Sequence, residues 1–339
     1  KAQVPVGMKH GKIVAGFYRA RTHEIADMEL CLIQHPQNDA AVREVKRLLQ
    51  MFHLSPYDEK KHRGLIRHIF VRIGVKSQEL MVVLVTNGKT LPREKEFVTA
   101  LVRTFPHLRS VIQNINTQRT NVILGPKNRL LYGWEYILDS IGDIRFAISA
   151  HSFYQVNPAQ TEVLYQQVKR YAKLTGQETV MDVYCGIGTI ALYLANDAKK
   201  VYGIEIVPDA VKDAKYNAKL NEIKNVEFVQ GAAEKILPVW RKMGKKADVV
   251  IVDPPRKGCH EELLKAVASM APKRWIYVSC NSATLARDAR RMADLGYELV
   301  EIQPVDMFPQ TSHVECCALF LPSSSSEKMV SSHDEEGNK

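Results

Sequence analysis

The sequence contains no apolar run of about 18 residues, which a membrane-spanning helix would need. It begins KAQVP, with neither a signal-peptide core nor an initiator methionine, so we expect a processed chain or missing upstream sequence. The six cysteines form no CxxC pair and no regular framework, which argues against a secreted disulfide scaffold. We therefore expect reduced thiols in a cytoplasmic protein.

Acidic residues are scarce in the first part of the chain only. Residues 1–150 hold 23 basic and 13 acidic side chains, whereas residues 151–339 hold 24 of each. The net charge of +10 therefore comes entirely from the first part. A basic region beside a neutral one indicates that the first holds a polyanion while the second carries out chemistry, unless the first is merely a basic surface.

Residues 1–150 have the pattern of a mixed α+β domain. Apolar residues at helical spacing predict a helix over 40–49, and a second helix is predicted over 95–105. β-Branched runs predict a hairpin of 66–73 with 80–85. Four further strands are predicted: 110–115, 120–124, 130–138 and 144–148. Seven basic residues lie on or beside these strands, and could follow a phosphate backbone or simply cover a solvated face: Arg63, Arg67, Arg72, Arg109, Arg119, Lys127 and Arg129.

Residues 151–321 alternate between strand and helix patterns, which predicts a Rossmann-like α/β domain with a parallel sheet covered on both faces. Seven strands are predicted: 179–183, 200–206, 226–230, 248–252, 275–279, 298–305 and 313–321. Six helices are predicted: 160–174, 188–194, 208–221, 233–243, 261–270 and 285–295. Ligands of such sheets bind beyond the carboxyl ends of the strands. Residues 322–339 are polar and aperiodic, and they predict a disordered tail.

A glycine-containing loop follows the first of these strands, in the segment 182–189 (DVYCGIGT). Gly186 permits a tight turn, and Gly188 lets a ligand approach the backbone at the start of a helix. Ala191 replaces the third glycine of a dinucleotide-binding loop, and no phosphate-binding lysine follows. Glu205 ends the next strand and can accept two hydrogen bonds from a ribose diol. This combination favours S-adenosylmethionine over NAD or ATP, the alternative being a Rossmann sheet without a working site.

Two further motifs follow the fourth and fifth strands. Asp253 precedes two prolines that fix the chain as it leaves the sheet, so it could position a base or the sulfonium region of the cofactor, unless this is an ordinary strand exit. Cys280 precedes a helix, whose N-terminus favours thiolate over thiol. Carbon 5 of a pyrimidine cannot attack a sulfonium until a nucleophile adds at carbon 6. Cys280 is the predicted nucleophile, and a buried structural thiol is the alternative.

A base must remove the carbon 5 proton before such an adduct can break down. Glu315 is the one carboxylate of the apolar strand predicted over 313–321, so burial should raise its pKa toward neutrality. His313 is the rival base, because a spacing of two puts it on the same face, although a structural histidine is the simpler interpretation. Cys316 and Cys317 are predicted to be packing residues.

At these residues the sequence resembles the RNA uracil-C5 methyltransferases, and most nearly the Gram-positive bacterial branch that acts on 23S ribosomal RNA. Five motifs in order carry the resemblance: SFYQVN (152–157), DVYCGIG (182–188), DPPR (253–256), SCN (279–281) and HVE (313–315). The resemblance covers about residues 1–321. It implies that Gln155, Tyr184, Glu205 and Asp253 contact the methyl donor or the target base. It also implies that the cysteine of SCN is the nucleophile and the glutamate of HVE the proton acceptor.

The chain departs from the family pattern at two places. Ala232 stands where relatives often place Asp or Asn to read adenine, so backbone groups would have to serve. The segment 28–32 (MELCL) resembles the one that bears the fourth cysteine ligand of a 4Fe–4S cluster, which makes Cys31 the candidate ligand. The other three ligands and the family's small RNA-binding β-barrel would lie upstream of Lys1. One cysteine cannot hold a cluster, so a cluster would belong to the full-length protein only.

We therefore expect a monomeric enzyme, in which a Rossmann-like S-adenosylmethionine-dependent methyltransferase domain (151–321) follows a smaller α+β RNA-binding domain (1–150). It would convert a uridine of 23S ribosomal RNA, flipped out of a single-stranded loop, to 5-methyluridine. The same reaction on transfer RNA is the nearest alternative. Cytosine C5 methylation is disfavoured because no cysteine flanks Pro254 and Pro255. A non-catalytic RNA-binding factor is the alternative of another class.

Overall fold

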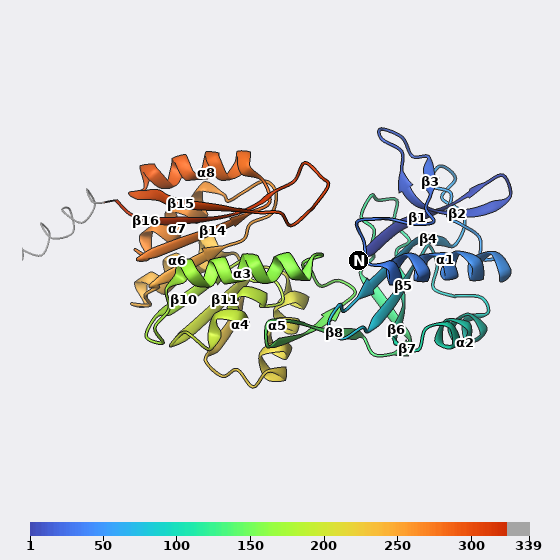
Figure 1. Cartoon of the computed structure of the whole chain (residues 1–339), viewed down its shortest axis with the longest axis horizontal. Helices are drawn as coiled ribbons and strands as arrows, with labels where there is room; N and C mark the ends of the chain where they lie inside the picture. Colours follow the sequence, from blue (N-terminus) through green and yellow to red (C-terminus); the bar gives the residue numbers. More distant parts are fainter. Residues whose placement is uncertain (324–339) are drawn as a thin grey trace, which may run out of the picture. The chain divides into compact units, whose positions relative to one another are not determined.

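The computed structural model describes residues 1–323 and divides the chain into two compact units (Figure 1). Unit 1 comprises Lys1–Ser140 with Ala147–His151, and unit 2 comprises Ile141–Phe146 with the chain from Ser152 onward. None of the helices in the described part is long and apolar enough to cross a bilayer. The tail predicted over 322–339 lies outside the described residues from position 324 on.

Unit 1 is built on a seven-stranded sheet in the order β3-β2-β1-β4-β5-β6-β7. Neighbouring strands are antiparallel except β5 and β6, which run parallel and are joined through a helix. The strands are β1 (Ala2–Lys9), β2 (Lys12–Tyr18), β3 (Ile25–Asp27), β4 (Ile66–Ile73), β5 (Leu80–Thr86), β6 (Leu108–Ile115) and β7 (Lys127–Gly133). The predicted hairpin is confirmed as β4 and β5, in which Ile73 pairs with Leu80.

Two helices cover the sheet of unit 1, α1 (Pro36–Met51) and α2 (Glu94–Thr104). The apolar stripe predicted on the first helix is confirmed, because Val42, Val45 and the two leucines that follow at 48 and 49 are fully buried against the strands. A stripe of this width buries one face of a helix and leaves the other in water. The core of unit 1 therefore lies between these helices and the sheet.

Two sequence-based expectations for unit 1 are wrong. The predicted strand 120–124 is a loop that pairs with no other strand. The predicted strand 130–138 is split between β7 and β8 (Tyr136–Ile141), which forms a separate hairpin with β9 (Ile144–Ser149). A glycine with positive φ, Gly133, ends β7 and allows this break.

Unit 2 contains a second seven-stranded sheet, in the order β12-β11-β10-β13-β14-β16-β15. The first five strands in this order are parallel, and β16 runs antiparallel to both of its neighbours. The strands are β10 (Thr179–Val183), β11 (Lys200–Glu205), β12 (Val226–Gln230), β13 (Val249–Val252), β14 (Arg274–Ser279), β15 (Tyr297–Val305) and β16 (Glu315–Pro322). Pro322, predicted to start the tail, thus ends the last strand instead.

Helices cover both faces of this sheet (Figure 1). On one face lie α3 (Pro158–Ala172), α4 (Thr189–Ala195) and α5 (Pro208–Leu220); on the other lie α6 (Ala233–Lys242), α7 (Glu261–Ser269) and α8 (Ser282–Asp294). All four residues of β13 are buried, as expected for a strand covered on both sides. The predicted order of alternating strands and helices is confirmed throughout unit 2.

Candidate active site

One edge of the unit 2 sheet collects most of the predicted site residues. Four parallel strands end there: β10 at Val183, β11 at Glu205, β13 at Val252 and β14 at Ser279. Because β16 runs antiparallel to β14, its first residue, Glu315, lies at the same edge. Ser279 pairs with Cys316, so Cys280 and Glu315 follow at the ends of two neighbouring strands, which lie about 4.8 Å apart in a sheet.

The loop after β10 turns through three residues with positive φ: Tyr184 (69°), Gly186 (55°) and Gly188 (84°). Gly188 caps α4, and a Cβ atom there would lie 2.7 Å from Cζ of Phe228. A Cβ atom on Gly186 would meet no other atom within 4 Å. Internal packing therefore explains the glycine at 188. The open space that would let a ligand approach the backbone, which the sequence predicts at Gly188, lies at Gly186 instead.

Glu205 is half-buried and is bonded to this loop. Its Oε2 accepts a hydrogen bond from the N–H of Gly186 at 3.1 Å, and its Oε1 accepts one from the N–H of Val207 at 2.8 Å. A carboxylate oxygen has two acceptor sites, so each oxygen can accept a further hydrogen bond. The carboxylate is thus held beside the open position 186 with capacity for hydroxyl donors.

Asp182, to which the sequence patterns assigned no role, is buried in β10. Its Oδ2 accepts the N–H of Ala191 at 2.9 Å, while its Oδ1 has no hydrogen-bond partner within residues 1–323. Burial raises the pKa of Asp182 to about 7, although the bond from Ala191 opposes this. A buried carboxyl oxygen without a partner beside a ligand loop indicates a bound donor group. A carboxylate at the end of an apolar strand is the sequence signal that could have identified it.

The Cys280 thiol is half-exposed and is more basic than the sequence predicted. Burial raises its pKa, and the charges of Glu315 and Asp253 raise it further. The N-terminus of α8, which the sequence predicts to favour the thiolate, does not lower the pKa of Cys280 overall. The side chain of Asn281 caps that helix and accepts the N–H of Ala283 at 3.0 Å, so the helix end is already bonded.

Two carboxyl groups lie near this thiol, the buried Glu315 and the half-buried Asp253. Burial raises the pKa of Glu315 to about 7, as its apolar strand predicted. Burial also raises the pKa of Asp253 well above its usual range, and the charges of Glu315 and Asp182 add to the effect. With a pKa of about 7, Glu315 can exchange protons at physiological pH, which is the property expected of a general base.

The start of α8 fastens the loop that follows Asp253. The carbonyl oxygen of Arg256 accepts hydrogen bonds from Nδ2 of Asn281 and from the hydroxyl of Thr284, both at 3.3 Å. The residues directly after Cys280 thus hold the segment directly after Asp253. The thiol and this carboxyl group are therefore supported by one set of bonds.

Asp288 extends the same support from inside the protein. It is fully buried, and its Oδ2 accepts the N–H of Cys259 and the hydroxyl of Tyr277, both at 2.8 Å. Its Oδ1 accepts the Nε–H of Arg287 at 2.9 Å. These bonds join β14, α8 and the loop after β13, so Asp288 is a structural carboxylate behind the edge rather than a reacting group.

Gln155 and His313 lie in loops. Gln155 is half-buried in the segment before α3, where Asn157 donates a hydrogen bond from Nδ2 to the carbonyl of Met307 at 3.2 Å. This bond ties the Gln155 segment to the loop that leads to Glu315. His313 lies in that loop, exposed and outside β16. The argument that His313 shares a strand face with Glu315 is therefore wrong. Cys316 and Cys317 are buried, as predicted for packing residues.

Cys31 lies half-buried in the loop between β3 and α1, where its N–H donates to Oδ2 of Asp39 at 3.2 Å. Among the described residues, no group of three or more His, Cys, Asp or Glu side chains could hold a metal ion. The other five cysteines all belong to unit 2. The residues of this chain therefore do not fit a 4Fe–4S cluster.

The basic residues of unit 1 do not form one phosphate-binding face. Arg67 and Arg72 are buried, at 5% and 4% exposure. Arg109 and Arg129 form ion pairs with acidic side chains of the same unit. Strand periodicity cannot distinguish an arginine in water from one that is buried inside the protein, and both interpretations made from the sequence are wrong for Arg67 and Arg72.

Comparisons with known proteins agree with this geometry. Residues 107–323 match the family model described as tRNA (uracil-5-)-methyltransferase. An RNA methyltransferase of Halalkalibacterium halodurans is 56% identical over 94% of this chain and 70% of its own length. A Listeria monocytogenes RNA methyltransferase is 53% identical over 93% of this chain and 69% of its own length.

A similar solved structure is the Pyrococcus abyssi tRNA (uracil-54, C5)-methyltransferase in complex with S-adenosyl-L-homocysteine. It superposes with a TM-score of 0.79 at 29% sequence identity, covering 94% of this chain and 75% of that one. The similarity therefore extends over both units.

Proposed function

Because the chain belongs to the tRNA (uracil-5-)-methyltransferase family, we propose that it methylates carbon 5 of a uridine in 23S ribosomal RNA, with Cys280 as nucleophile and Glu315 as base. S-Adenosylmethionine is the methyl donor of this fold. The resemblance of the five motifs to the 23S branch supports the ribosomal substrate. The observation that supports the proposal is that Cys280 and Glu315 follow the paired residues at the ends of β14 and β16, near the half-buried Asp253.

The residues along this edge form two groups, one that would hold the methyl donor and one that would act on the uracil ring. When bound, S-adenosylmethionine supplies a methyl group on a positively charged sulfur. Glu205 would accept its ribose hydroxyls beside Gly186, and the unpartnered oxygen of Asp182 would accept a donor group of the same ligand. Strand order puts Cys280 at the other side, with Asp253 on the strand between. From the family resemblance, Gln155 and Tyr184 would complete the contacts to donor and base.

The reaction needs two proton transfers that involve side chains of the protein: the thiol of Cys280 loses a proton, and the carboxylate of Glu315 gains one. The raised pKa of Cys280 means that its thiol carries a proton, and because the side chain is half-exposed, water can take this proton as the sulfur bonds to carbon 6. After carbon 5 has gained the methyl group, Glu315 removes the proton that carbon 5 still carries. The electron pair of that C–H bond restores the double bond and expels the Cys280 sulfur.

Unit 1 would hold the RNA, since residues 1–150 carry all of the chain's net positive charge. We place the reaction in the cytoplasm, where ribosomal RNA is made and thiols stay reduced. Transfer RNA is the second candidate substrate, because the similar solved structure is that of a tRNA methyltransferase. The two substrates are separated by incubating the protein with methyl-labelled donor and either 23S ribosomal RNA or a transfer RNA transcript. We expect label in the ribosomal RNA; label in transfer RNA alone would overturn the choice.

The roles of Cys280 and Glu315 are tested by trapping the adduct. We expect Glu315→Gln to accumulate a protein–RNA complex that survives denaturing electrophoresis, because the methylated adduct cannot lose its proton. Cys280→Ser should give neither complex nor methyl transfer. Glu298→Gln, an exposed carboxylate of β15, and Cys31→Ser are the matched controls and should behave as wild type. Undiminished transfer by Cys280→Ser would refute the nucleophile assignment, whereas its loss would argue against a non-catalytic RNA-binding factor.

A further inference from the structure

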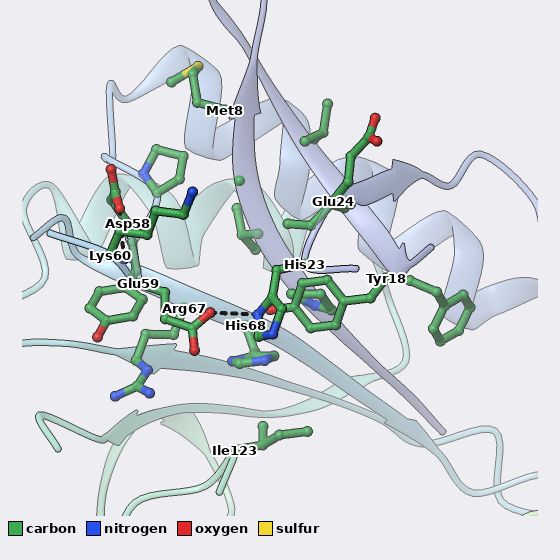
Figure 2. Close-up of a pocket in the computed structure, with 18 of the residues that line it drawn as sticks. Met8, Tyr18, His23, Glu24, Asp58, Glu59, Lys60, Arg67, His68 and Ile123 are labelled. Atoms are coloured by element: carbon green, nitrogen blue, oxygen red, sulfur yellow. Dashed lines mark hydrogen bonds and ion pairs between the residues drawn. The ribbon is translucent and has the colours of Figure 1, made fainter. Parts of the chain in front are cut away.

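Unit 1 contains a cavity of about 730 Å³ that plays no part in the mechanism above (Figure 2). It is lined by β1, β2 and β4 and by the loops around residues 19–24, 56–60 and 120–123. All of these belong to unit 1. Its volume lies within the range of about 300–1,000 Å³ that is typical of small-molecule sites, and it exceeds the size of a nucleoside.

The charges that line this cavity cancel. Three basic and three acidic side chains contribute: Lys9, Lys60, Arg67, Glu24, Asp58 and Glu59. Lys9 and Glu24 form an ion pair at 2.8 Å, and Nδ1 of His23 lies 2.9 Å from Oε2 of Glu59 (Figure 2). A cavity of zero net charge with paired ions offers little to a free phosphate group, which binds where cations are in excess.

Arg67 is the one arginine among these lining residues; both of its terminal nitrogens are bonded, and its Nε has no hydrogen-bond partner within residues 1–323. Its guanidinium donates to the backbone carbonyls of Asn116 at 2.8 Å, Gln118 at 2.7 Å and Thr120 at 3.1 Å. It also lies over the ring of Tyr57, with 4.6 Å from Cζ to the ring centroid. These bonds fix the guanidinium against the cavity wall and hold the loop of residues 116–120 beside it.

Aromatic rings remain as the groups available to a ligand. Tyr18 is 46% exposed at the end of β2, and its ring centroid lies 5.5 Å from that of His23. His68 contributes an imidazole that stays neutral at physiological pH, since burial lowers its pKa to about 4. Neutral imidazoles and tyrosine hydroxyls donate and accept hydrogen bonds, and their rings stack on flat ligands. This is the chemistry that recognises an unpaired nucleobase.

We infer that this cavity is a second RNA subsite, which binds one unpaired nucleoside of the substrate through stacking on Tyr18 and hydrogen bonds from the lining. The inference rests on the proposed function in one respect, that the ligand belongs to an RNA substrate. The net charge of +10 of residues 1–150 attracts the RNA backbone, and the neutral aromatic cavity takes a base from it. The subsite would bind a second nucleotide of the RNA that carries the methylated uridine.

The test measures the dissociation constant of a 23S ribosomal RNA transcript in the absence of methyl donor. Stacking of one base is worth about 1–3 kcal/mol by alanine substitution, so Tyr18→Ala should weaken binding about tenfold and raise KM alike, with kcat within about twofold of wild type. Tyr18→Phe keeps the ring and should bind within about threefold of wild type. The matched control is Tyr132→Ala, an exposed aromatic of β7 outside the cavity, which should bind as wild type.

A second measurement identifies the occupant. The same RNA, transcribed with 4-thiouridine and irradiated on the wild-type protein, should crosslink to peptides containing Tyr18 or His23. Unchanged binding by Tyr18→Ala, equal weakening by Tyr132→Ala, or crosslinks from unit 1 that all lie outside the cavity would overturn the subsite. If Tyr18→Ala unfolds, Tyr18→Leu replaces it, because leucine keeps apolar volume without a ring. A protein that binds RNA through Tyr18 yet transfers no methyl group would refute the proposed reaction and leave the subsite standing.

Discussion

Unit 1 and unit 2 both bury charged side chains, and the two sets differ in their bonding. In unit 1, the guanidinium of Arg67 donates to three carbonyls, and the carboxylate of Asp139 accepts the N–H groups of Val75 at 3.0 Å and Lys76 at 2.9 Å. In unit 2, burial raises the pKa values of the carboxyl groups at positions 182, 253 and 315, all at the carboxyl edge of the sheet. A buried charge costs free energy unless bonds compensate it. Burial therefore disfavours the ionised form of the three carboxyl groups of unit 2.

The difference teaches which buried charges are structural and which are functional. Asp288 shows that the division follows bonding rather than the unit, because it lies in unit 2 and yet accepts hydrogen bonds from three groups. Well-bonded carboxylates hold elements together, whereas carboxyl groups with raised pKa values beside a thiol can exchange protons. The predictions below replace one member of each class by a neutral side chain of similar shape.

The largest difference is expected in catalysis. Glu315→Gln should lower kcat for methyl transfer by about a thousandfold, because a lost general base typically costs about 10²–10⁴ in rate. Asp139→Asn removes a buried carboxylate of unit 1 and should leave kcat within about threefold of wild type. Both are measured with labelled donor at saturating RNA. If kcat fell equally in both variants, the loss would follow from removing any buried carboxylate, and Glu315 would have no special role as a base.

The next difference is expected in stability. Arg67→Met leaves three carbonyls of the 116–120 loop without their donor, and should lower the free energy of unfolding of unit 1 by about 3–4 kcal/mol. Arg119→Met, at an exposed position of the same loop, should change it by less than about 0.5 kcal/mol. Urea unfolding gives both values, and hydrogen exchange should quicken around residues 116–124 in the first variant only. A stable Arg67→Met protein with an unchanged loop would contradict the structural role.

The two units also differ in how far their sequences predict them. In unit 2, β10 occupies the predicted residues 179–183, and alternating strands and helices bring the ends of distant strands to one edge, where Cys280 and Glu315 meet. In unit 1, β1 pairs with β4 over Ala2–Pro5 and with β2 from Val6 onward. β4 follows β1 in the sequence only after β2, β3 and α1, so no short-range pattern indicates that these strands pair.

Local rules fail where distant residues decide the environment. The position of Cys280 before α8 predicts a thiolate, yet the Asn281 side chain caps that helix, and Glu315 and Asp253 approach from other strands. The β-branched residues of 120–124 predict a strand, yet the Arg67 side chain binds the carbonyls just before them. The pKa of Glu315 was predictable because an apolar strand buries its residues whatever lies beside it.

The smallest predicted effect is on stability. It measures the free-energy cost of burying the Glu315 carboxylate separately from the role of this group in catalysis. Its pKa is about 7 in the folded chain and about 4.5 when unfolded, so the folded state holds this proton more tightly. Stability is therefore unaffected below pH 4.5, falls as the pH rises from 4.5 to 7, and stays reduced above that range. Glu315→Gln cannot ionise, so its free energy of unfolding in urea should exceed that of wild type by about 3 kcal/mol at pH 8 and equal it at pH 4.5. Glu298→Gln, exposed on β15, should show no such dependence. A Glu315→Gln variant that gains nothing at pH 8 would mean that the carboxylate is compensated, as Asp139 is.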